Sequence, residues 1–313
     1  MQWSDRIGRR LKPRDLHVFL AVAEQGNMAK AAERLAISRP VVSKTIADLE
    51  HTLGVRLLDR TPQGVEPTVY GRALLKRSLA VFDELRQSVK EIEFLADPNS
   101  SELSVGCSEV MAAGFVAAVI AELSRRFPRL AIQTELGTVR QQFVPIRERK
   151  CELFVARASA AMPEPDTDRE FLFHDWPLIV VGSHSKWARR RKIGLADLTN
   201  ARWIISQGEI LPDGPFAEAF QEGGLSAPRP TILSDSLNLR RSLLAREEFV
   251  TIVPGSVLHF GPEPAEFKVL PIKVRPWKLP ISITTLKGRT LGSAASLFSQ
   301  CARELAKPVA KTR

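Results

Sequence analysis

Small polar and cationic side chains collect on one side of a predicted helix that begins after Ser38. Serine is a preferred capping residue. The apolar residues that follow are spaced by 4, 3 and 4 positions: Val42, Ile46, Leu49 and Leu53. The opposite side carries no large apolar residue: Arg39, Pro40, Ser43, Lys44 and Ala47. Such a face on the first turns of a helix suits the DNA major groove, so the spacing predicts double-stranded DNA as a partner.

Two further helices and a hairpin are expected to position this helix. Apolar residues with helical spacing precede it: Leu16, Phe19, Leu20 and Ala23. Gly26 can end that helix, and Asn27 can cap the next one. Residues 55–59 and 65–69 flank a turn at 61–64 and predict a hairpin with Arg60 at its tip. A plain three-helix packing unit is the alternative. The residues expected to contact DNA are Lys30, Ser38, Arg39, Pro40, Ser43, Lys44, Arg60 and Thr68.

The segment from Leu16 to Leu75 resembles the winged helix-turn-helix of LysR-type transcriptional regulators. The landmarks that match in order and spacing are Phe19, Ala31, Ala32, Leu35, Ser38, Pro40, Ser43, Leu49, Glu50, Leu53, Gly54, Leu57, Arg60, Thr61, Gly64, Thr68 and Gly71. The resemblance continues more loosely to about residue 305. One departure concerns base preference, because the family commonly has Gln where this chain has Arg39. Arginine pairs with guanine whereas glutamine suits adenine.

Length and composition bound the remaining possibilities. The 313 residues fit two or three domains, and the net charge of +10 suggests an anionic partner. Residues 1–70 hold 11 Lys/Arg and 8 Asp/Glu, so the charge is not concentrated there. Three widely spaced cysteines argue against a disulfide framework, and five scattered histidines predict neither a metal site nor a cofactor. Without a signal peptide or an apolar run of about 20 residues, we expect a cytoplasmic protein with no membrane partner.

A long helix is predicted over residues 71–96, capped by Thr68. Its apolar positions repeat every 3.4 residues on average, close to a coiled-coil seam: Leu75, Leu79, Phe82, Leu85, Val89 and Ile92. In the resembled family this helix pairs with its copy in a second subunit. An ordinary surface helix of the same chain is the alternative. We expect residues 1–70 to form the winged helix-turn-helix, 71–96 the linker and 97–101 a hinge.

Residues 102–307 alternate predicted strands and helices, which indicates parallel α/β structure. The expected strands are 103–107, 131–136, 151–156, 178–181, 203–206, 231–233, 249–253 and 281–285. The expected helices are 112–126, 139–149, 212–222, 236–245 and 294–306. A second lobe is expected over about 176–265. This order looks like the two-lobed, periplasmic-binding-protein-like effector domain that LysR-type regulators use as a sensor.

Ligands of open parallel sheets bind beyond the carboxyl ends of the strands. That rule and the resemblance select seven effector-binding residues: Ser108, Glu109, Thr138, Arg157, Ser206, Gln207 and Pro254. These groups would suit a small polar or carboxylated molecule, such as an organic acid or a sugar-like metabolite. A structural bridge from Arg157 to Glu109, or to another acid, is the alternative. Cys107, next to the cleft, is expected to be a passive hydrophobic residue rather than a redox sensor.

The sequence therefore predicts a DNA-binding transcriptional regulator modulated by a small-molecule effector between two lobes. The alternative is a solute-binding protein or small-molecule enzyme with an unrelated helical appendage. No catalytic motif is present, so no catalytic residue is proposed. The cationic run 186–192 is expected to be a solvated loop rather than a second nucleic-acid contact. The resemblance further implies a dimer of dimers that binds a promoter inverted repeat, with RNA polymerase as a candidate partner.

Overall fold

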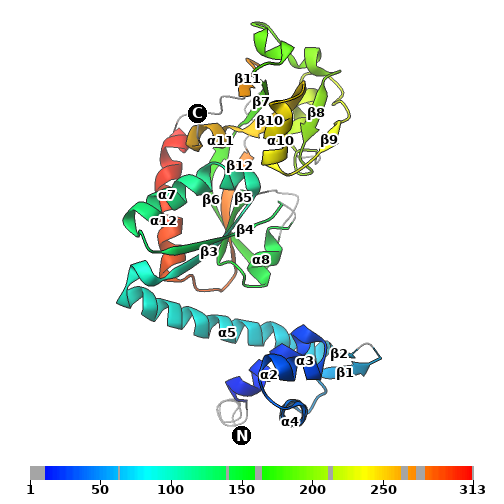
Figure 1. Ribbon diagram of the computed structural model, residues 1–313, viewed down its shortest axis with the longest axis vertical. Helices are drawn as coiled ribbons and strands as arrows, with labels where there is room; N and C mark the ends of the chain where they lie inside the picture. The colour runs from blue at the N-terminus through cyan, green and yellow to red at the C-terminus, as the bar shows by residue number, and fades with distance from the viewer. Residues whose placement is uncertain are drawn as a thin grey trace. The chain divides into compact units, whose positions relative to one another are not determined.

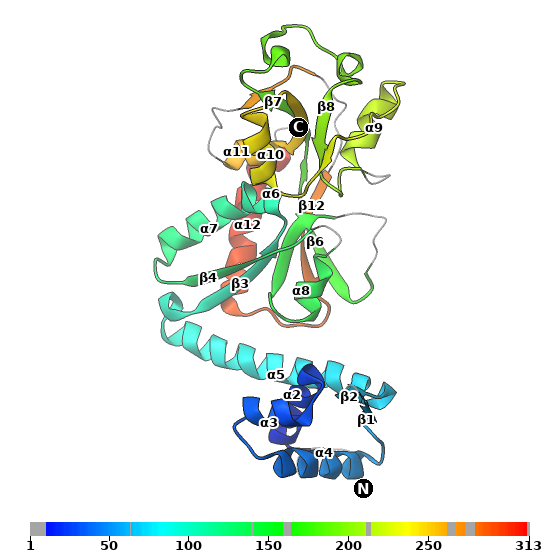
Figure 2. The same cartoon turned by 45° about the vertical axis from the view of Figure 1, so that its right-hand side comes forward.

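A computed structural model describes residues 11–62, 64–138, 141–158, 164–210, 214–261, 267–272 and 279–311. The chain divides into two compact units, Met1–Val89 and Lys90–Arg313. The division falls inside one long helix, α5 (Val69–Ala96), which Figures 1 and 2 show. Each unit has its own hydrophobic core. The basic N-terminal stretch around Arg6 to Arg10 lies outside the described residues.

Three short helices form the core of the first unit. They are α2 (Pro13–Gln25), α3 (Met28–Arg34) and α4 (Arg39–Leu53). Gly26 ends α2 in the left-handed conformation, with φ of 60°. Asn27 caps α3, because its side-chain oxygen accepts hydrogen bonds from the backbone N–H of Ala29 at 2.7 Å and Lys30 at 3.3 Å. Both predicted helix boundaries are confirmed.

The start of α4 differs in one detail from the prediction. Ser38 occupies the capping position, but its side chain makes no capping hydrogen bond. Pro40 lies in the first turn, where its fixed φ favours helix and its missing N–H costs nothing. The backbone conformation of Pro40, rather than a serine hydroxyl, therefore begins the helix.

The hairpin is shorter than predicted and shifted along the chain. Strands β1 (Leu58–Thr61) and β2 (Gly64–Pro67) pair antiparallel, with Arg60 opposite Val65 rather than at the tip. The second strand cannot reach residue 69, because Val69 already begins α5. Of the predicted turn, Gln63 lies outside the described residues.

The hairpin closely approaches the turn between α2 and α3 at two glycines, Gly26 and Gly64. Val65 donates its N–H to the carbonyl of Gly26 at 2.8 Å, and a Cβ added to Gly64 would lie 2.3 Å from that carbonyl oxygen. Gly64 also has φ of +142°, which other residues rarely adopt. Only glycine therefore allows the hairpin to approach the turn between α2 and α3 so closely.

The apolar stripe of α5 does not face one partner. Leu75 packs against the core of the first unit, and the Phe82 ring lies 5.6 Å from the ring of His17. In contrast, Leu85 and Val89 are 50% and 55% exposed, and Ile92 is 67% exposed. The predicted stripe is therefore divided, because the same chain covers its first part, and pairing of the rest with a second copy stays a prediction.

The first lobe of the second unit is built on a five-stranded mixed sheet in the order β4-β3-β5-β12-β6. The strands are β3 (Glu102–Cys107), β4 (Ala131–Leu136), β5 (Leu153–Arg157), β6 (Thr167–Asp175) and β12 (Leu279–Leu286). Strand β3 runs parallel to β4 and β5, whereas β12 runs antiparallel to β5 and β6. The parallel order expected for β3, β4 and β5 is confirmed, whereas β6 is an addition that alternation alone did not predict.

Helices cover both faces of this sheet. α7 (Phe115–Arg126) and α12 (Ser293–Lys311) share one core with it, and α8 (Phe143–Arg147) packs on β5 and β12 (Figure 1). Helix α8 is shorter than the predicted 139–149, of which 139 and 140 lie outside the described residues. A short 3-10 helix, η1 (Pro98–Ser100), links α5 to β3.

The second lobe is a smaller sheet in the order β11-β7-β10-β8-β9. The strands are β7 (Pro177–Gly182), β8 (Arg202–Ile205), β9 (Ile232–Leu233), β10 (Phe249–Pro254) and β11 (Phe267–Val269). Helix α9 (Pro215–Glu222) packs on one face and α10 (Leu237–Leu244) on the other. Strand β11 extends this lobe beyond the expected residue 265, and residues 212 and 213 of the predicted helix 212–222 lie outside the described part. Two 3-10 helices, η2 (Lys186–Arg189) and η3 (Leu195–Leu198), follow β7.

The two lobes contact each other at a break between two helices of the first lobe. The helix predicted over 112–126 is in fact two helices, α6 (Glu109–Ala112) and α7, separated at Gly114. A Cβ on Gly114 would lie 2.8 Å from the carbonyl oxygen of Ser256 and 2.9 Å from Cα of Val257. Both residues belong to α11 (Gly255–Phe260), which follows the last long strand of the second lobe. Gly114 is therefore where the backbones of the two lobes meet.

No helix within the described ranges combines the length and apolar character needed to cross a lipid bilayer.

Candidate functional site

Helix α4 has the two-sided character that its sequence predicts. Val42, Ile46 and Leu49 are buried in the core of the first unit. Arg39, Pro40 and Lys44 are exposed on the opposite side, and Ser43 is half-buried between them. Neither Arg39 nor Lys44 forms an ion pair with any other described residue. The first two turns therefore offer cationic and small polar groups to a partner.

The other predicted DNA-binding residues surround this face in different ways. Lys30 on α3 and Ser38 before α4 are exposed. Thr68 serves the fold, because its hydroxyl donates to the carbonyl of Arg56 at 2.7 Å and accepts from the N–H of Gly71 at 3.0 Å. Arg60 lies in β1, and its side chain is outside the described part of the chain.

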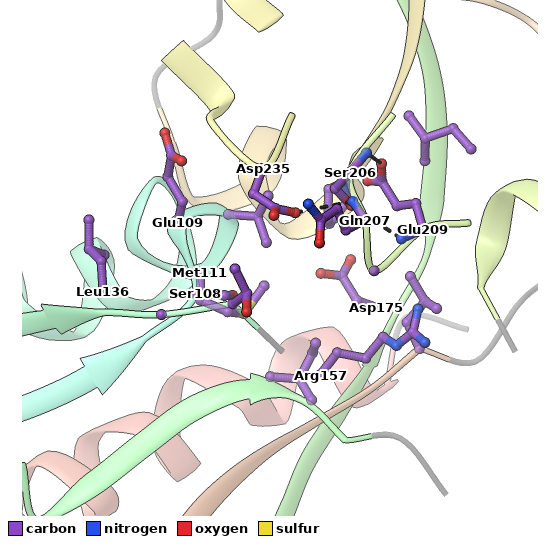
Figure 3. A pocket seen from close by; sticks show the side chains of 18 of the residues that line it. Ser108, Glu109, Met111, Leu136, Arg157, Asp175, Ser206, Gln207, Glu209 and Asp235 are labelled. Carbon is purple, nitrogen blue, oxygen red and sulfur yellow. Dashed lines mark hydrogen bonds between the residues drawn. The ribbon is translucent and has the colours of Figure 1, made fainter. Parts of the chain in front are cut away.

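A cavity of about 310 Å³ lies between the two lobes of the second unit. It opens at the carboxyl ends of β3, β4, β5, β8 and β10, where parallel-sheet ligands bind (Figure 3). It is lined by all seven residues selected from the sequence: Ser108, Glu109, Thr138, Arg157, Ser206, Gln207 and Pro254. Its volume is at the lower end of the range for small-molecule sites. The strand-end rule therefore located this cavity correctly.

Several polar lining residues were not predicted: Gln141, Asp175, Glu209, Asp235 and Arg240. Asp175 ends β6, a strand that the sequence reading missed, and Asp235 follows the two-residue strand β9. Arg240 lies inside α10. A buried guanidinium in a helix shows no distinctive sequence pattern, so only Asp235, two residues after a predicted strand, could have been found by the same rule.

A buried ion pair holds one wall of the cavity. The side chain of Arg240 is 1% exposed, and its Nη1 lies 3.1 Å from Oε2 of Glu209. The guanidinium also donates to the carbonyls of Ser234 at 3.0 Å and Ile252 at 3.3 Å. Glu209 in turn accepts the N–H of Ser206 at 2.7 Å. Arg240 therefore fixes the loop that carries Ser206 and Gln207.

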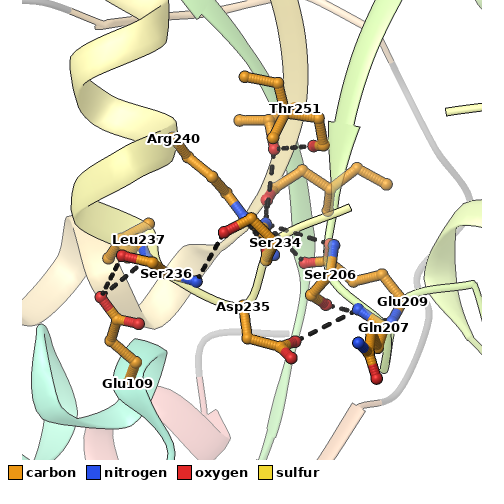
Figure 4. Close-up of polar contacts among 12 residues, drawn as sticks. Glu109, Ser206, Gln207, Glu209, Ser234, Asp235, Ser236, Leu237, Arg240 and Thr251 are labelled. Atoms are coloured by element: carbon orange, nitrogen blue, oxygen red, sulfur yellow. Dashed lines mark hydrogen bonds and ion pairs between the residues drawn. The ribbon is translucent and has the colours of Figure 1, made fainter. Parts of the chain in front are cut away.

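Glu109 connects the two lobes (Figure 4). It begins α6 in the first lobe, and its Oε1 accepts the N–H of Leu237 at 2.8 Å and of Asn238 at 3.4 Å in the second. The hydroxyl of Ser236 donates to the same oxygen at 3.4 Å. A carboxylate at this end of α10 satisfies unpaired N–H groups and complements the helix dipole.

Asp175 lies at the crossing between the lobes, one residue before Trp176. It is 1% exposed, and its carboxylate accepts the N–H of Trp176 at 2.8 Å, the N–H of Ser256 at 3.0 Å and the Ser256 hydroxyl. Burial raises the pKa of Asp175 above its ordinary value, although these hydrogen bonds act in the opposite direction. The carboxyl therefore anchors α11 to the end of β6.

Cys107 fits the passive role. It is fully buried, and burial raises the pKa of its thiol to about 11. The pKa of the buried Cys151 thiol is raised to about 12, again mainly by burial. Thiolate is the reactive form, so both groups are inert thiols at neutral pH.

Part of the cationic run 186–192 is neutralised by neighbouring acids. Lys186 pairs with Glu248 at 3.0 Å and Arg190 with Asp197 at 3.4 Å, and both cations lie about 5 Å from the ring of Trp187. Arg189, Arg191 and Lys192 are exposed. These contacts describe an ordered surface loop with a moderate excess of positive charge.

These two units define a class of protein: a winged helix-turn-helix reader joined to a two-lobed sensing domain. Residues 13–72 match the bacterial regulatory helix-turn-helix proteins of the lysR family, and residues 96–307 match the LysR substrate binding domain. The chain belongs to the LysR family and is a DNA-binding transcriptional regulator with an effector-binding domain. A solute-binding protein with an unrelated helical appendage is not favoured, because the N-terminal segment matches the same family.

Relatives match over nearly the whole chain. The HTH-type transcriptional regulator GbpR of Azospirillum brasilense is 27% identical over 287 residues, covering 91% of this chain and 84% of its own. TdcA of Escherichia coli, also an HTH-type transcriptional regulator, is 26% identical over 294 residues, covering 94% and 93%. Full-length CbnR complexed with its target DNA shares the fold, with a TM-score of 0.65 at 22% identity, covering 94% and 99%.

Proposed function

We propose that the first two turns of α4 read the operator sequence. Arg39, Pro40 and Ser43 approach base edges in the major groove, with Arg39 selecting a guanine through two hydrogen bonds. Ser38, Lys44 and Arg60 hold backbone phosphates, and Lys30 adds a further cation near the DNA. Thr68 is assigned no phosphate, because its hydroxyl is already hydrogen-bonded within the fold. The observation that supports this division is the exposure of Arg39 and Lys44 on the face of α4 opposite its buried apolar residues.

Substituting Arg39 and Lys44 separates base reading from phosphate binding. Arg39→Ala should cost about 1–3 kcal/mol on the operator and relax the preference at one base pair. Lys44→Ala should weaken operator and random DNA alike and flatten the salt dependence. Fluorescence anisotropy of labelled duplexes at several salt concentrations measures both effects. An equal loss of operator and random binding in Arg39→Ala would refute the role of Arg39 in base reading.

We further propose that the inter-lobe cavity binds the small-molecule effector. The supporting observation is that the carboxyl ends of β3, β4 and β5 in one lobe and of β8 and β10 in the other line one cavity of about 310 Å³. Arg157 would recognise a carboxylate or another anionic group, while Ser108, Thr138 and Ser206 offer hydroxyls to an organic acid or a sugar-like molecule. Effector binding would change the relation of the lobes only by preferring one arrangement, and a tenfold preference corresponds to about 1.4 kcal/mol.

A thermal-shift screen of the full chain against a metabolite library tests this site. Compounds that bind in the cavity should raise the melting temperature of the wild type. Organic acids among them should no longer raise the melting temperature of Arg157→Met. They should still raise that of Arg229→Met, the control, because Arg229 is exposed and does not line the cavity. Hits that are neutral and insensitive to Arg157→Met would remove Arg157 from the site.

The exposed apolar part of α5 supports a dimer, with Leu85, Val89 and Ile92 against a second copy. We propose a dimer of dimers that binds an inverted repeat with half-sites about one helical turn apart, or a multiple of that spacing. We propose RNA polymerase as a further partner of the regulator bound at its promoter. A protein that binds promoter DNA works in the cytoplasm of a bacterial cell.

A further inference from the structure

The charged side chains that line the inter-lobe cavity include more acids than bases, which disfavours a purely anionic ligand. Arg240 and Glu209 neutralise each other as a buried pair. The other charged lining residues are one cation, Arg157, and three carboxyl groups, at Glu109, Asp175 and Asp235. A ligand with only negative charge would therefore enter a cavity whose remaining lining is net acidic.

The helix end that could attract an anion is already occupied by the protein. Helix N-termini bind carboxylates through their unpaired N–H groups. At α10 the N–H of Leu237 donates to Oε1 of Glu109 at 2.8 Å, and the N–H of Asn238 donates to it at 3.4 Å. Glu109 thus takes the place that an effector carboxylate would otherwise fill at this end of the cavity.

Two carboxylate oxygens beside this helix end keep free acceptor capacity. Oδ1 of Asp235 accepts the N–H of Gln207 at 3.2 Å, but no donor from the described residues bonds to its Oδ2. The same is true of Oε2 of Glu109 within the described chain. Asp235 and Glu109 both lie at the start of α10. Asp235 directly precedes Ser236 in the chain, and the Ser236 hydroxyl donates to Glu109 (Figure 4). An ammonium group has three donors and fits two such acceptors.

The rest of the cavity suits a carboxylate and an apolar body. Arg157 extends from the end of β5 in the first lobe and lies apart from Glu109 and Asp235 (Figure 3). Apolar lining is supplied by Met111, Leu136, Ile252, Leu279 and Ile281. The cavity therefore has an acidic end with free hydrogen-bond acceptors, a cationic end and an apolar wall.

Building on the proposed effector-binding function, we infer that the effector is a small zwitterion of the amino-acid class. Its ammonium group binds between Asp235 and Glu109, its carboxylate binds Arg157, and its carbon skeleton contacts the apolar wall. An organic acid without an amino group has no cation to bind the carboxylates of Asp235 and Glu109.

Two matched sets of compounds test this inference on the full-length chain by isothermal titration. The first set is L-leucine, 4-methyl-2-oxopentanoate and 3-methylbutylamine. The second set is 5-aminopentanoate, pentanoate and pentylamine, in which the charged groups lie farther apart. At least one zwitterion should bind at least tenfold more tightly than the acid and the amine of its own set. An acid that binds as tightly as its zwitterion, or the failure of both zwitterions to bind, overturns the inference.

Variants assign the ammonium site. Asp235→Asn should weaken the zwitterion at least tenfold and leave the acid unchanged, whereas Glu222→Gln on the exposed end of α9 should change neither. Glu109→Ala should strengthen binding of the acid, because it frees the N-terminus of α10. Unchanged zwitterion binding in Asp235→Asn, with operator affinity and melting temperature as in the wild type, overturns the assignment.

The same data separate this inference from the proposed function. An acid that binds without its amino group and is lost in Arg157→Met keeps the cavity as the effector site but excludes the zwitterion. Binding that neither Arg157→Met nor Asp235→Asn affects contradicts both.

Discussion

Replacing Arg240 by methionine should destabilise the second lobe strongly. The guanidinium is 1% exposed and pairs with a Glu209 side chain that is 11% exposed. Breaking a buried pair by removing one partner costs about 3–5 kcal/mol, because the remaining charge loses its compensation. Glu209 keeps its hydrogen bond from Ser206 N–H and borders the cavity, so it can be partly hydrated. We therefore expect the lower end, about 3 kcal/mol.

Hydrogen exchange followed by mass spectrometry localises this effect. Arg240 lies in α10 and donates to the carbonyl of Ile252 in β10, so we expect peptides from these two elements to respond. A loss of 3 kcal/mol corresponds to roughly a hundredfold faster exchange. Peptides from α4 in the other unit serve as an internal reference. Arg229→Met, at an exposed arginine, is the matched control and should leave exchange in α10 unchanged.

A double variant distinguishes lost charge pairing from lost packing. Arg240→Met combined with Glu209→Gln removes both charges and keeps an acceptor for Ser206 N–H. It should recover at least half of the loss, because replacing a whole buried pair is often nearly neutral. Exchange in Arg240→Met that is less than tenfold faster, or a double variant no better than the single one, would refute the reasoning.

Two further predictions concern assembly and pH. Leu85→Asp with Val89→Asp should convert the assembly to monomers in sedimentation, whereas Lys76→Asp at an exposed position of the same helix should not; unchanged oligomers would contradict the proposed α5 contact. The raised pKa of Asp175 means that the folded state holds a proton that the unfolded state releases above about pH 3.8, so wild-type stability should fall relative to Asp175→Asn as pH rises through this window. Parallel urea-unfolding curves of the two proteins across about pH 4–7 would exclude this contribution.

Local patterns predicted the reader and the lining of the cavity well. The faces of α4 follow from helical periodicity, and the helix ends at Gly26 and Asn27 follow from backbone chemistry that acts within a few residues. The seven cavity-lining residues were predicted because every parallel strand places its following loop at the same edge of the sheet, and their binding of an effector stays a prediction.

Features that depend on distant partners were not predictable in this way. Strand β6 pairs antiparallel with β12, more than 100 positions further along the chain, and Glu109 caps a helix that begins at Leu237. The apolar stripe of α5 is split because His17 covers Phe82. No pattern within a short window contains the partner in these cases, so neither the pairing nor the burial could be read from it.

Between residues 81 and 92, the burial of helix α5 does not follow its apolar residues. Asp83 and Gln87 are buried, whereas Leu85 and Val89 face water. A lone chain therefore carries both the cost of burying polar groups and the cost of hydrating apolar ones, and a second copy would relieve the latter. In the proposed dimer, stability would rise with protein concentration by mass action. The abundance of the regulator would then become an input to its own activity, alongside any metabolite that it senses.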